Sequence, residues 1–171
     1  MRVYVKVIIY LAIFSILHFG YDLTHWNFLV PICGIDESVF QHLKMAFWAY
    51  LFTSIIEYFL SRKRFGKRES FWYTRLLSTV ILPWFIVLIW YVVPALFGKV
   101  ESLIVDLVWA IFSTFLSAIL AITVERSIED IKAALSFKLV ILFLFIISAF
   151  LYVWFTYQPP WIDLFVNPEL L

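Results

Sequence analysis

Hydrophobic residues fill five long stretches of this chain, and charged or helix-breaking residues gather between them. The stretches cover residues 3–19, 39–61, 76–97, 103–124 and 139–157. A helix of about 20 apolar residues, each adding about 1.5 Å, crosses the hydrocarbon layer of a membrane. The four glycines all fall between the stretches, at Gly20, Gly34, Gly66 and Gly98. The pattern predicts an all-α fold, an integral membrane bundle of five transmembrane helices that form a single domain over residues 1–171.

The first stretch follows Arg2 and Lys6, which is the charge-then-apolar order of a secretory signal. No pair of small residues follows at the spacing that a signal peptidase cleaves, so we expect this stretch to remain as the first span. Only fifteen residues without a formal charge separate Lys6 from Asp22, which is about 22 Å of helix. Either Lys6 reaches back to the membrane surface, or His18 and Asp22 lie below it.

Two of the later stretches carry further helix signals. Ser38 and Gln41 have the spacing of a capping box at the start of the second stretch, and Asp36 is an alternative cap. In the fourth stretch, small residues repeat every four positions, at Ala110, Thr114 and Ala118 and at Ser113, Ser117 and Ala121. Small residues at this spacing let helices approach closely, so we expect the fourth helix to be the central packing element.

Lysine and arginine are distributed unevenly around the five stretches. Eleven fall on one side of the predicted membrane, and only Lys44 and Lys99 fall on the other. The eleven are Arg2, Lys6, Arg62, Lys63, Arg64, Lys67, Arg68, Arg75, Arg126, Lys132 and Lys138. Because cytoplasmic loops carry the excess of these residues, we expect a multi-pass protein of the cell membrane with its amino terminus inside and its carboxyl terminus outside.

The composition agrees with this class of protein. Hydrophobic residues make up 64% of the chain and charged residues 15%, whereas a soluble domain carries about 25% charged residues. The net charge of +1 excludes nucleic acid as a partner and leaves the lipid bilayer as the expected surroundings. The single cysteine, Cys33, cannot form an internal disulfide, so we expect it to be a packed thiol.

The residues that could carry chemistry gather between the first two stretches. All three histidines of the chain lie in the segment from His18 to Lys44, together with three acidic residues. The candidate group is His18, Asp22, His25, Asp36, Glu37 and His42. If the helix continues past the first stretch, His18, Asp22 and His25 share one of its faces. The predicted topology gathers the whole group in a small volume on the outer side of the membrane.

Four interpretations of this group are open. The side chains satisfy one another and lock the first two helices together, or they hold a divalent metal through His18, Asp22, His25 or His42 with Glu37. Imidazole and carboxylate ligands suit zinc or iron, although no H-E-x-x-H motif is present. The third interpretation is an ion or organic-ligand pocket shared with Asp106 and Asp163, and the fourth is haem held between His18 and His42.

Two further acidic residues have structural explanations. Glu57 comes about one turn before the basic loop that begins at Arg62, and we expect it to pair with an arginine of that loop rather than to carry protons. Asp106 comes near the start of the fourth stretch, where the positive end of a helix dipole favours a carboxylate.

Three motifs resemble a known family. The run D-E-S-V-F-Q-H-L-K from Asp36 to Lys44 is similar to the N-E-S-V-W-E-H-L-K signature of an uncharacterised prokaryotic family of small multi-pass membrane proteins. The H-F-x-Y-[DE] pattern at His18 to Asp22 and the tail T-Y-Q-P-P-W-I-D-L-F from Thr156 to Phe165 are similar to the ends of that family. The resemblance implies a five-helix membrane fold without an established activity, and it directs attention to His18, Glu37, His42, Pro159 and Pro160. Asp36 and Gln41 depart from the signature, which has Asn and Glu there, so any role of that Glu does not carry over.

These observations favour a binding or interaction protein, because the polar group shows no recognisable catalytic order. It binds an ion or small ligand in an outer-leaflet pocket, or it is an accessory subunit of a membrane complex, with a membrane-protein partner or a second copy of itself. The alternative is a metal-dependent membrane hydrolase or transferase, in which Glu37 is the base and His18, Asp22 and His42 are ligands. A transporter is less well supported, since the chain shows no internal repeat.

Overall fold

The fold contains helices and no strands in the part of the chain that the computed structural model describes, residues 1–65, 70–98 and 102–167. Its elements are α1 (Val3–Thr24), η1 (Asn27–Leu29), α2 (Val39–Phe65), α3 (Ser70–Trp90), α4 (Val92–Phe97), α5 (Leu103–Ile128), α6 (Leu135–Tyr157) and η2 (Asp163–Phe165), where η marks a 3-10 helix. Within those residues, five segments are long and apolar enough to cross a membrane, with α3 and α4 counted as one. This confirms the prediction of a multi-pass, all-α membrane protein.

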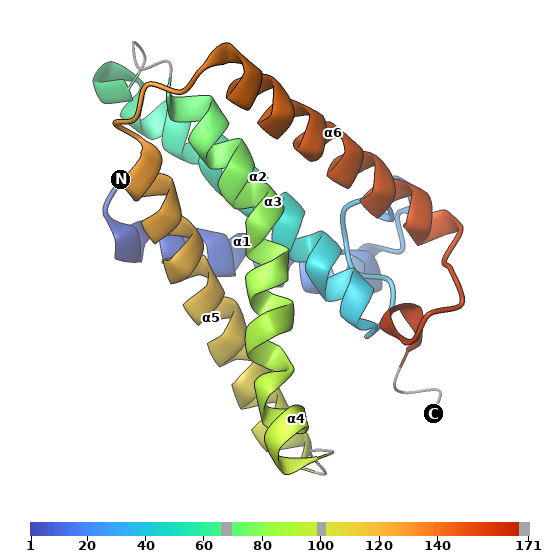
Figure 1. The fold of residues 1–171 in the computed structure, drawn as a ribbon. Helices are drawn as coiled ribbons and strands as arrows, with labels where there is room; N and C mark the ends of the chain where they lie inside the picture. The colour runs from blue at the N-terminus through green and yellow to red at the C-terminus, as the bar shows by residue number, and fades with distance from the viewer. Residues whose placement is uncertain (66–69, 99–101, 168–171) are drawn as a thin grey trace.

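The helices alternate in direction, and their ends gather at one shared end and at two separate places away from it (Figure 1). At one end, here called the basic end, α1 begins, α2 ends, α3 begins, α5 ends and α6 begins. At the other end α1 stops, α2 starts and α6 stops, and this is called the histidine end. The tip that carries α4 lies apart from the histidine end in the same view. There the Trp109 indole N–H donates to the Trp90 carbonyl oxygen at 2.9 Å and joins α5 to α3.

The helices are longer than their hydrophobic stretches. At the basic end α2 continues to Phe65, α3 begins at Ser70, α5 continues to Ile128 and α6 begins at Leu135, against expected limits of 61, 76, 124 and 139. At the histidine end α1 continues to Thr24 rather than to residue 19. Gly66 and Lys99 lie outside the described residues. Arg75, Glu125 and Arg126 at the basic end therefore belong to helices rather than to loops.

The fourth hydrophobic stretch, now α5, packs closely on α3 through its small residues. Ser113, Ser117, Ala118 and Ala121 are fully buried. The Ser78 hydroxyl of α3 donates to the carbonyl oxygen of Ala121 at 3.0 Å, which places the two helices in near backbone contact. The hydroxyls of Ser113 and Ser117 donate to carbonyl oxygens one turn earlier in α5, at 2.7 and 2.6 Å. Small side chains without unpaired polar atoms thus form this interface, as the four-residue repeat predicts.

Aromatic rings connect α6 and the tail to α2. Phe47 of α2 stacks on Phe145 of α6 with ring centroids 5.3 Å apart, and Phe40 contacts Phe165 of the tail with centroids 4.5 Å apart.

Beside these rings Lys44 is fully buried. Its ammonium group donates to the Val30 carbonyl oxygen at 2.8 Å and to the Thr156 hydroxyl at 3.2 Å. These bonds satisfy a charge that would otherwise be costly at this depth.

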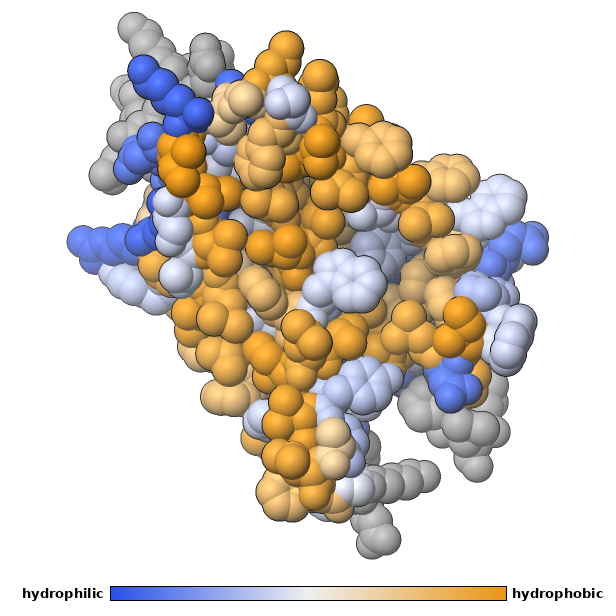
Figure 2. Space-filling model, viewed as in Figure 1, coloured by the Kyte–Doolittle hydropathy of each residue, from blue (hydrophilic) through white to orange (hydrophobic). Residues whose placement is uncertain are grey.

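Large apolar side chains dominate the outer surface (Figure 2). Many of them stand on α5 and α6, for example Ile104 at 75% exposure and Leu135 at 71%. In a soluble protein so large an apolar surface would cause association, whereas lipid tails cover it without cost. Hydrophilic side chains are confined in this view mainly to the basic end and to the region around the tail.

The connection between α1 and α2 folds back onto α1. His25 ends α1 in the left-handed conformation, with φ of 53°, and its amide donates to the Tyr21 carbonyl oxygen at 2.7 Å. Further on, the Gly34 amide donates to the Leu17 carbonyl oxygen at 3.1 Å. Cys33 is buried against Gly20, where an added Cβ would lie 3.1 Å from the cysteine Sγ. The connection is therefore packed against α1.

We expect Cys33 to react slowly with iodoacetamide. Burial raises the pKa of its thiol, and the nearby Lys44 ammonium offsets this only in part, so less of the reactive thiolate is present. Alkylation at pH 8 should be about tenfold slower than at a free thiol, and denaturation should abolish the difference. The matched control is Asn27→Cys in a Cys33→Ser background, because Asn27 is exposed in the same connection. Equal rates at the two positions would show that the connection is not packed.

Candidate metal-binding site

The start of α2 fixes two of the candidate residues at the histidine end. The Ser38 hydroxyl accepts the Gln41 amide at 3.4 Å, and the Asp36 carboxylate accepts the Ser38 amide at 2.8 Å. Ser38 is therefore the cap, but Gln41 does not complete the capping box, since its side-chain oxygen is buried without a hydrogen-bond partner in the described part of the chain. These bonds hold Glu37 just before the helix and His42 in its first turn, where both face α1.

His18, Glu37 and His42 converge where α1 ends and α2 begins. One potential ligand atom from each lies within 4.8 Å of the other two. The Glu37 Oε2 atom is 3.5 Å from His42 Nε2 and 3.8 Å from His18 Nε2. The two imidazole rings meet edge to face, with centroids 5.3 Å apart. Among the described residues, this is the group of histidine, cysteine and acidic side chains that is close enough to share one metal ion.

The orientation of His42 is set by the backbone. Its Nδ1 atom lies 2.9 Å from the Ser38 carbonyl oxygen. Because a carbonyl oxygen only accepts, Nδ1 carries the hydrogen, and a neutral ring then has its lone pair on Nε2. That lone pair faces the Glu37 carboxylate, which also only accepts when it is ionised. Two acceptors in this position are stabilised by a cation between them, either a proton on Nε2 or a metal ion.

His18 is held by aromatic neighbours on its own helix. Its ring stacks on Phe19 at 4.8 Å and meets Phe14 edge to face at 6.4 Å. The site is nevertheless open on one side, because the side chains of His18, His42 and Glu37 are 24%, 30% and 39% exposed. An ion held by these three groups would keep a position for water or another ligand.

The other candidate residues lie elsewhere. Asp22 is exposed on α1, and His25 is exposed just beyond the end of that helix. Asp106 lies in the first turn of α5, as the helix-dipole argument expects, and Asp163 is exposed at the start of η2. None of these four belongs to the group formed by His18, Glu37 and His42. Glu37 lies where a third ligand would lie, as the metal interpretation expects, whereas the enzyme alternative gave it the role of a base.

A second polar group, at the basic end, was not recognised from the sequence as a unit. It is called the ionic cluster and consists of Lys6, Glu57, Arg75, Glu125 and Glu129. The Lys6 ammonium group is 2.7 Å from Glu57 Oε2 and 2.7 Å from both carboxylate oxygens of Glu125. Arg75 contacts Glu57 at 3.4 Å, Glu125 at 3.3 Å and Glu129 at 2.8 Å. The cluster thus joins α1, α2, α3 and the end of α5.

The ionic cluster is almost completely shielded from solvent. Lys6, Glu57, Arg75 and Glu125 are each 1–2% exposed, and the Tyr50 hydroxyl donates to Glu125 at 2.8 Å. Glu57 does pair with an arginine, as expected, but Arg75 belongs to α3 and not to a loop. A sequence signal for the cluster did exist. All its members fall at the predicted inner ends of hydrophobic stretches, so alternating helices bring them to the same depth.

Comparison with known proteins gives a family but no activity. A family model described as a family of unknown function (DUF6512) matches residues 2–169. No curated protein and no solved structure matches the chain. The match agrees with the resemblance to a family without an established activity, and it extends over the chain from α1 to the tail.

Proposed function

The chain belongs to the DUF6512 family, a family of unknown function, and from that premise we propose that this membrane protein binds a divalent transition-metal ion through His18, Glu37 and His42. The observation that supports this most is the approach of His42 Nε2 to Glu37 Oε2 at 3.5 Å while Nδ1 is engaged by the Ser38 carbonyl oxygen. A backbone or carboxylate acceptor on the second ring nitrogen is the usual support of a metal-binding histidine.

The ligand set points to zinc or ferrous iron. Two imidazoles and one carboxylate form the protein ligands of many zinc sites, and the same set with open positions binds non-haem iron. Ligand atoms around one tetrahedral zinc ion lie about 3.3 Å apart. The Glu37 oxygen lies 3.5 and 3.8 Å from the two histidines, and the three ligand atoms, all within 4.8 Å of one another, would move closer together around the ion.

The open side of the site favours one further candidate function, a metal-dependent hydrolase or transferase. Three protein ligands leave a coordination position for water, and zinc lowers the pKa of such a water to about 7, which produces hydroxide at neutral pH. We place this site at the outer face of the cell membrane, because the positive-inside rule favours a cytoplasmic basic end. In this version Glu37 is a ligand, and the substrate replaces or meets the metal-bound water.

Metal titration tests the proposal directly. The protein is purified in mild detergent, stripped with a chelator and titrated with Co²⁺ and Zn²⁺. We expect one ion per chain, with the visible absorption of a four-coordinate Co²⁺ site that Zn²⁺ displaces. His42→Ala and His18→Ala should each weaken Zn²⁺ binding by about 100-fold or more, since each removes a ligand.

The third histidine provides the matched control. His25→Asn removes an imidazole that lies outside the site and keeps a residue that tolerates the left-handed conformation. Its affinity for Zn²⁺ should equal that of the native chain. The proposal is wrong if the stripped protein takes up no stoichiometric ion, or if His25→Asn weakens binding as much as His42→Ala. A Soret band in the purified protein would instead identify haem.

A further inference from the structure

Helix lengths measure how deep the site formed by His18, Glu37 and His42 lies in the membrane. The reference level is the ionic cluster, where the Lys6 ammonium group is 2.7 Å from oxygens of Glu57 and Glu125. Lys6 is 1% exposed, so it is held inside the bundle and does not extend toward the membrane surface. The cluster therefore fixes one common level on α1, α2 and α5, from which distances along these helices can be compared.

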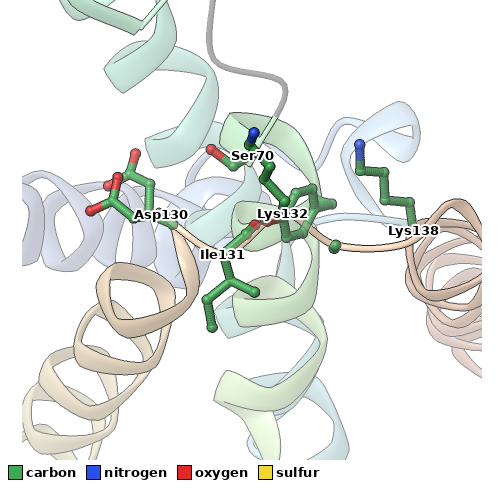
Figure 3. Close-up of a pocket in the computed structure, with 8 residues that line it drawn as sticks. Ser70, Asp130, Ile131, Lys132 and Lys138 are labelled. Atoms are coloured by element: carbon green, nitrogen blue, oxygen red, sulfur yellow. Dashed lines mark hydrogen bonds between the residues drawn. The ribbon is translucent and has the colours of Figure 1, made fainter.

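The ionic cluster lies close to the polar boundary of the membrane at the basic end. A cavity of about 500 Å³ opens next to it, between the start of α3 and the connection from α5 to α6. Polar side chains, among them Asp130 and Lys132, line most of this cavity (Figure 3). Glu129 belongs to the same lining and also accepts from Arg75 of the cluster at 2.8 Å. Since Arg126 is exposed as well, the polar surface begins at about the level of the cluster.

From that level, α1 reaches its polar end sooner than α5 does. His18 follows Lys6 by twelve residues, about 18 Å of helix, whereas Leu103 and Glu125 of α5 are twenty-two residues apart, about 33 Å. The hydrocarbon layer is about 30 Å thick, so α5 spans it and the part of α1 before His18 does not. A bilayer adapts to a short hydrophobic segment by thinning beside it, which brings the lipid interface toward His18.

Exposed side chains on α1 mark the layers of lipid around His18. Ile16, two residues before it, is apolar and 67% exposed, and Asp22, four residues after it, is exposed and charged. Trp26 and Phe28 follow, exposed and stacked on each other, as is typical of side chains at the membrane interface. Acyl chains therefore cover the level of Ile16, and polar head groups begin near Asp22. His18 lies between them, about 3 Å beyond the first and about 6 Å before the second, where ester groups join acyl chains to head groups.

Phe19 brings this level of the lipid next to the site. Its ring stacks on the His18 imidazole with centroids 4.8 Å apart, and its side chain is 56% exposed. Leu23, one turn further along α1, is also exposed and apolar. The side chain of His18 is itself 24% exposed. A lipid that packs along Phe19 and Leu23 therefore lies beside an imidazole of the site.

We propose that the open coordination position of the metal site takes the carbonyl oxygen of an acyl ester, carried by a phospholipid of the leaflet at the histidine end. This inference rests on the metal binding proposed above and names the ligand class of the same site. An ester carbonyl is an uncharged oxygen donor, whereas a charged phosphate enters the level of His18 only at a cost in free energy. Because zinc polarises a carbonyl that it binds, acyl esters are also the substrate class of the hydrolase or transferase alternative.

The depth of the site is tested without any metal. In a Cys33→Ser background, nitroxide labels are attached at Phe19→Cys, at Ala12→Cys as the reference for acyl chains and at Asp22→Cys as the reference for the polar layer, since all three positions are exposed on α1. In phosphatidylcholine bilayers, collisions with O₂ report lipid and collisions with a water-soluble nickel chelate report water. We expect the label at position 19 to meet the nickel chelate severalfold less often than the label at position 22, and O₂ more often. Equal access of the nickel chelate at positions 19 and 22 would place the site in water and overturn the proposal, whatever the metal affinity.

The ligand is tested by exchanging the lipid around the Co²⁺-loaded protein. Bilayer discs are made of diacyl phosphatidylcholine or of its dialkyl ether analogue, which has the same head group and chain length but no carbonyl. We expect the Co²⁺ absorption maximum to differ between the two discs, because only the ester lipid supplies the oxygen ligand. Glyceryl triacetate, a water-soluble ester, should not restore the ester-lipid spectrum in the ether disc, and restoration would overturn the lipid as the source. Identical spectra in the two discs would overturn the ester ligand, whereas a protein that takes up no Co²⁺ in either disc would overturn the metal site itself.

Discussion

Lys6→Met is expected to lower the free energy of unfolding by about 3–5 kcal/mol, because it removes one of the two buried cations, Lys6 and Arg75, that Glu57 and Glu125 share. Lys6 is 1% exposed, and its ammonium group is 2.7 Å from oxygens of both Glu57 and Glu125. Methionine has a similar length and is apolar, so the change removes charge without opening a large cavity. The measurement is thermal unfolding of the purified protein in detergent, followed by circular dichroism.

Two companion variants separate the loss of charge pairing from other effects. Arg2→Met removes an exposed cation near the start of the same helix, and it should change stability by less than about 1 kcal/mol. Lys6→Met combined with Glu125→Gln removes one charge of each sign and should recover part of the loss, because fewer uncompensated charges remain buried. A Lys6→Met protein as stable as the native chain would show that the ionic cluster does not depend on this cation.

The ionic cluster also explains why the sequence did not predict the limits of the helices. Hydrophobic stretches identified the five spans, because lipid requires each span to be apolar over most of its length. The same reasoning began the third span only after Arg75 and ended the fourth before Glu125, because hydropathy treats every charge as solvent-facing. Both residues are helical and buried because their partners stand on other helices. A single sequence shows which residues are charged but not which helices become neighbours.

The sequence also predicted the candidate site only in part. His18, Glu37 and His42 flank the first connection, and any antiparallel arrangement of α1 and α2 brings their segments together. Asp22 and His25 were expected on the face of His18, but His25 lies beyond the end of α1 in a left-handed conformation. That ending depends on how the connection folds back against Leu17 and Gly20, a tertiary effect that helical periodicity does not contain.

Ser117→Leu is expected to be the second strongly destabilising substitution, because it forces apart two helices in near backbone contact. Ser117 is fully buried and lies one turn before Ala121, whose carbonyl oxygen accepts the Ser78 hydroxyl of α3 at 3.0 Å. Residues four positions apart share a helix face, so a leucine at position 117 has no room between α5 and its neighbours. Overpacking of this kind costs about 1–3 kcal/mol, measured as thermal unfolding in detergent.

Two variants distinguish volume from hydrogen bonding at this interface. Thr123 is exposed on the same helix, and its hydroxyl donates to the Ile119 carbonyl oxygen at 2.8 Å, just as the Ser117 hydroxyl donates within α5. Thr123→Leu adds apolar volume on the outer surface and should leave stability nearly unchanged. Ser117→Ala removes the hydroxyl without adding volume. It should also be nearly neutral, because the Ser113 carbonyl oxygen keeps its backbone hydrogen bond within the helix. If Ser117→Ala destabilised the protein as much as Ser117→Leu, stability at position 117 would depend on the hydroxyl and not on close helix packing.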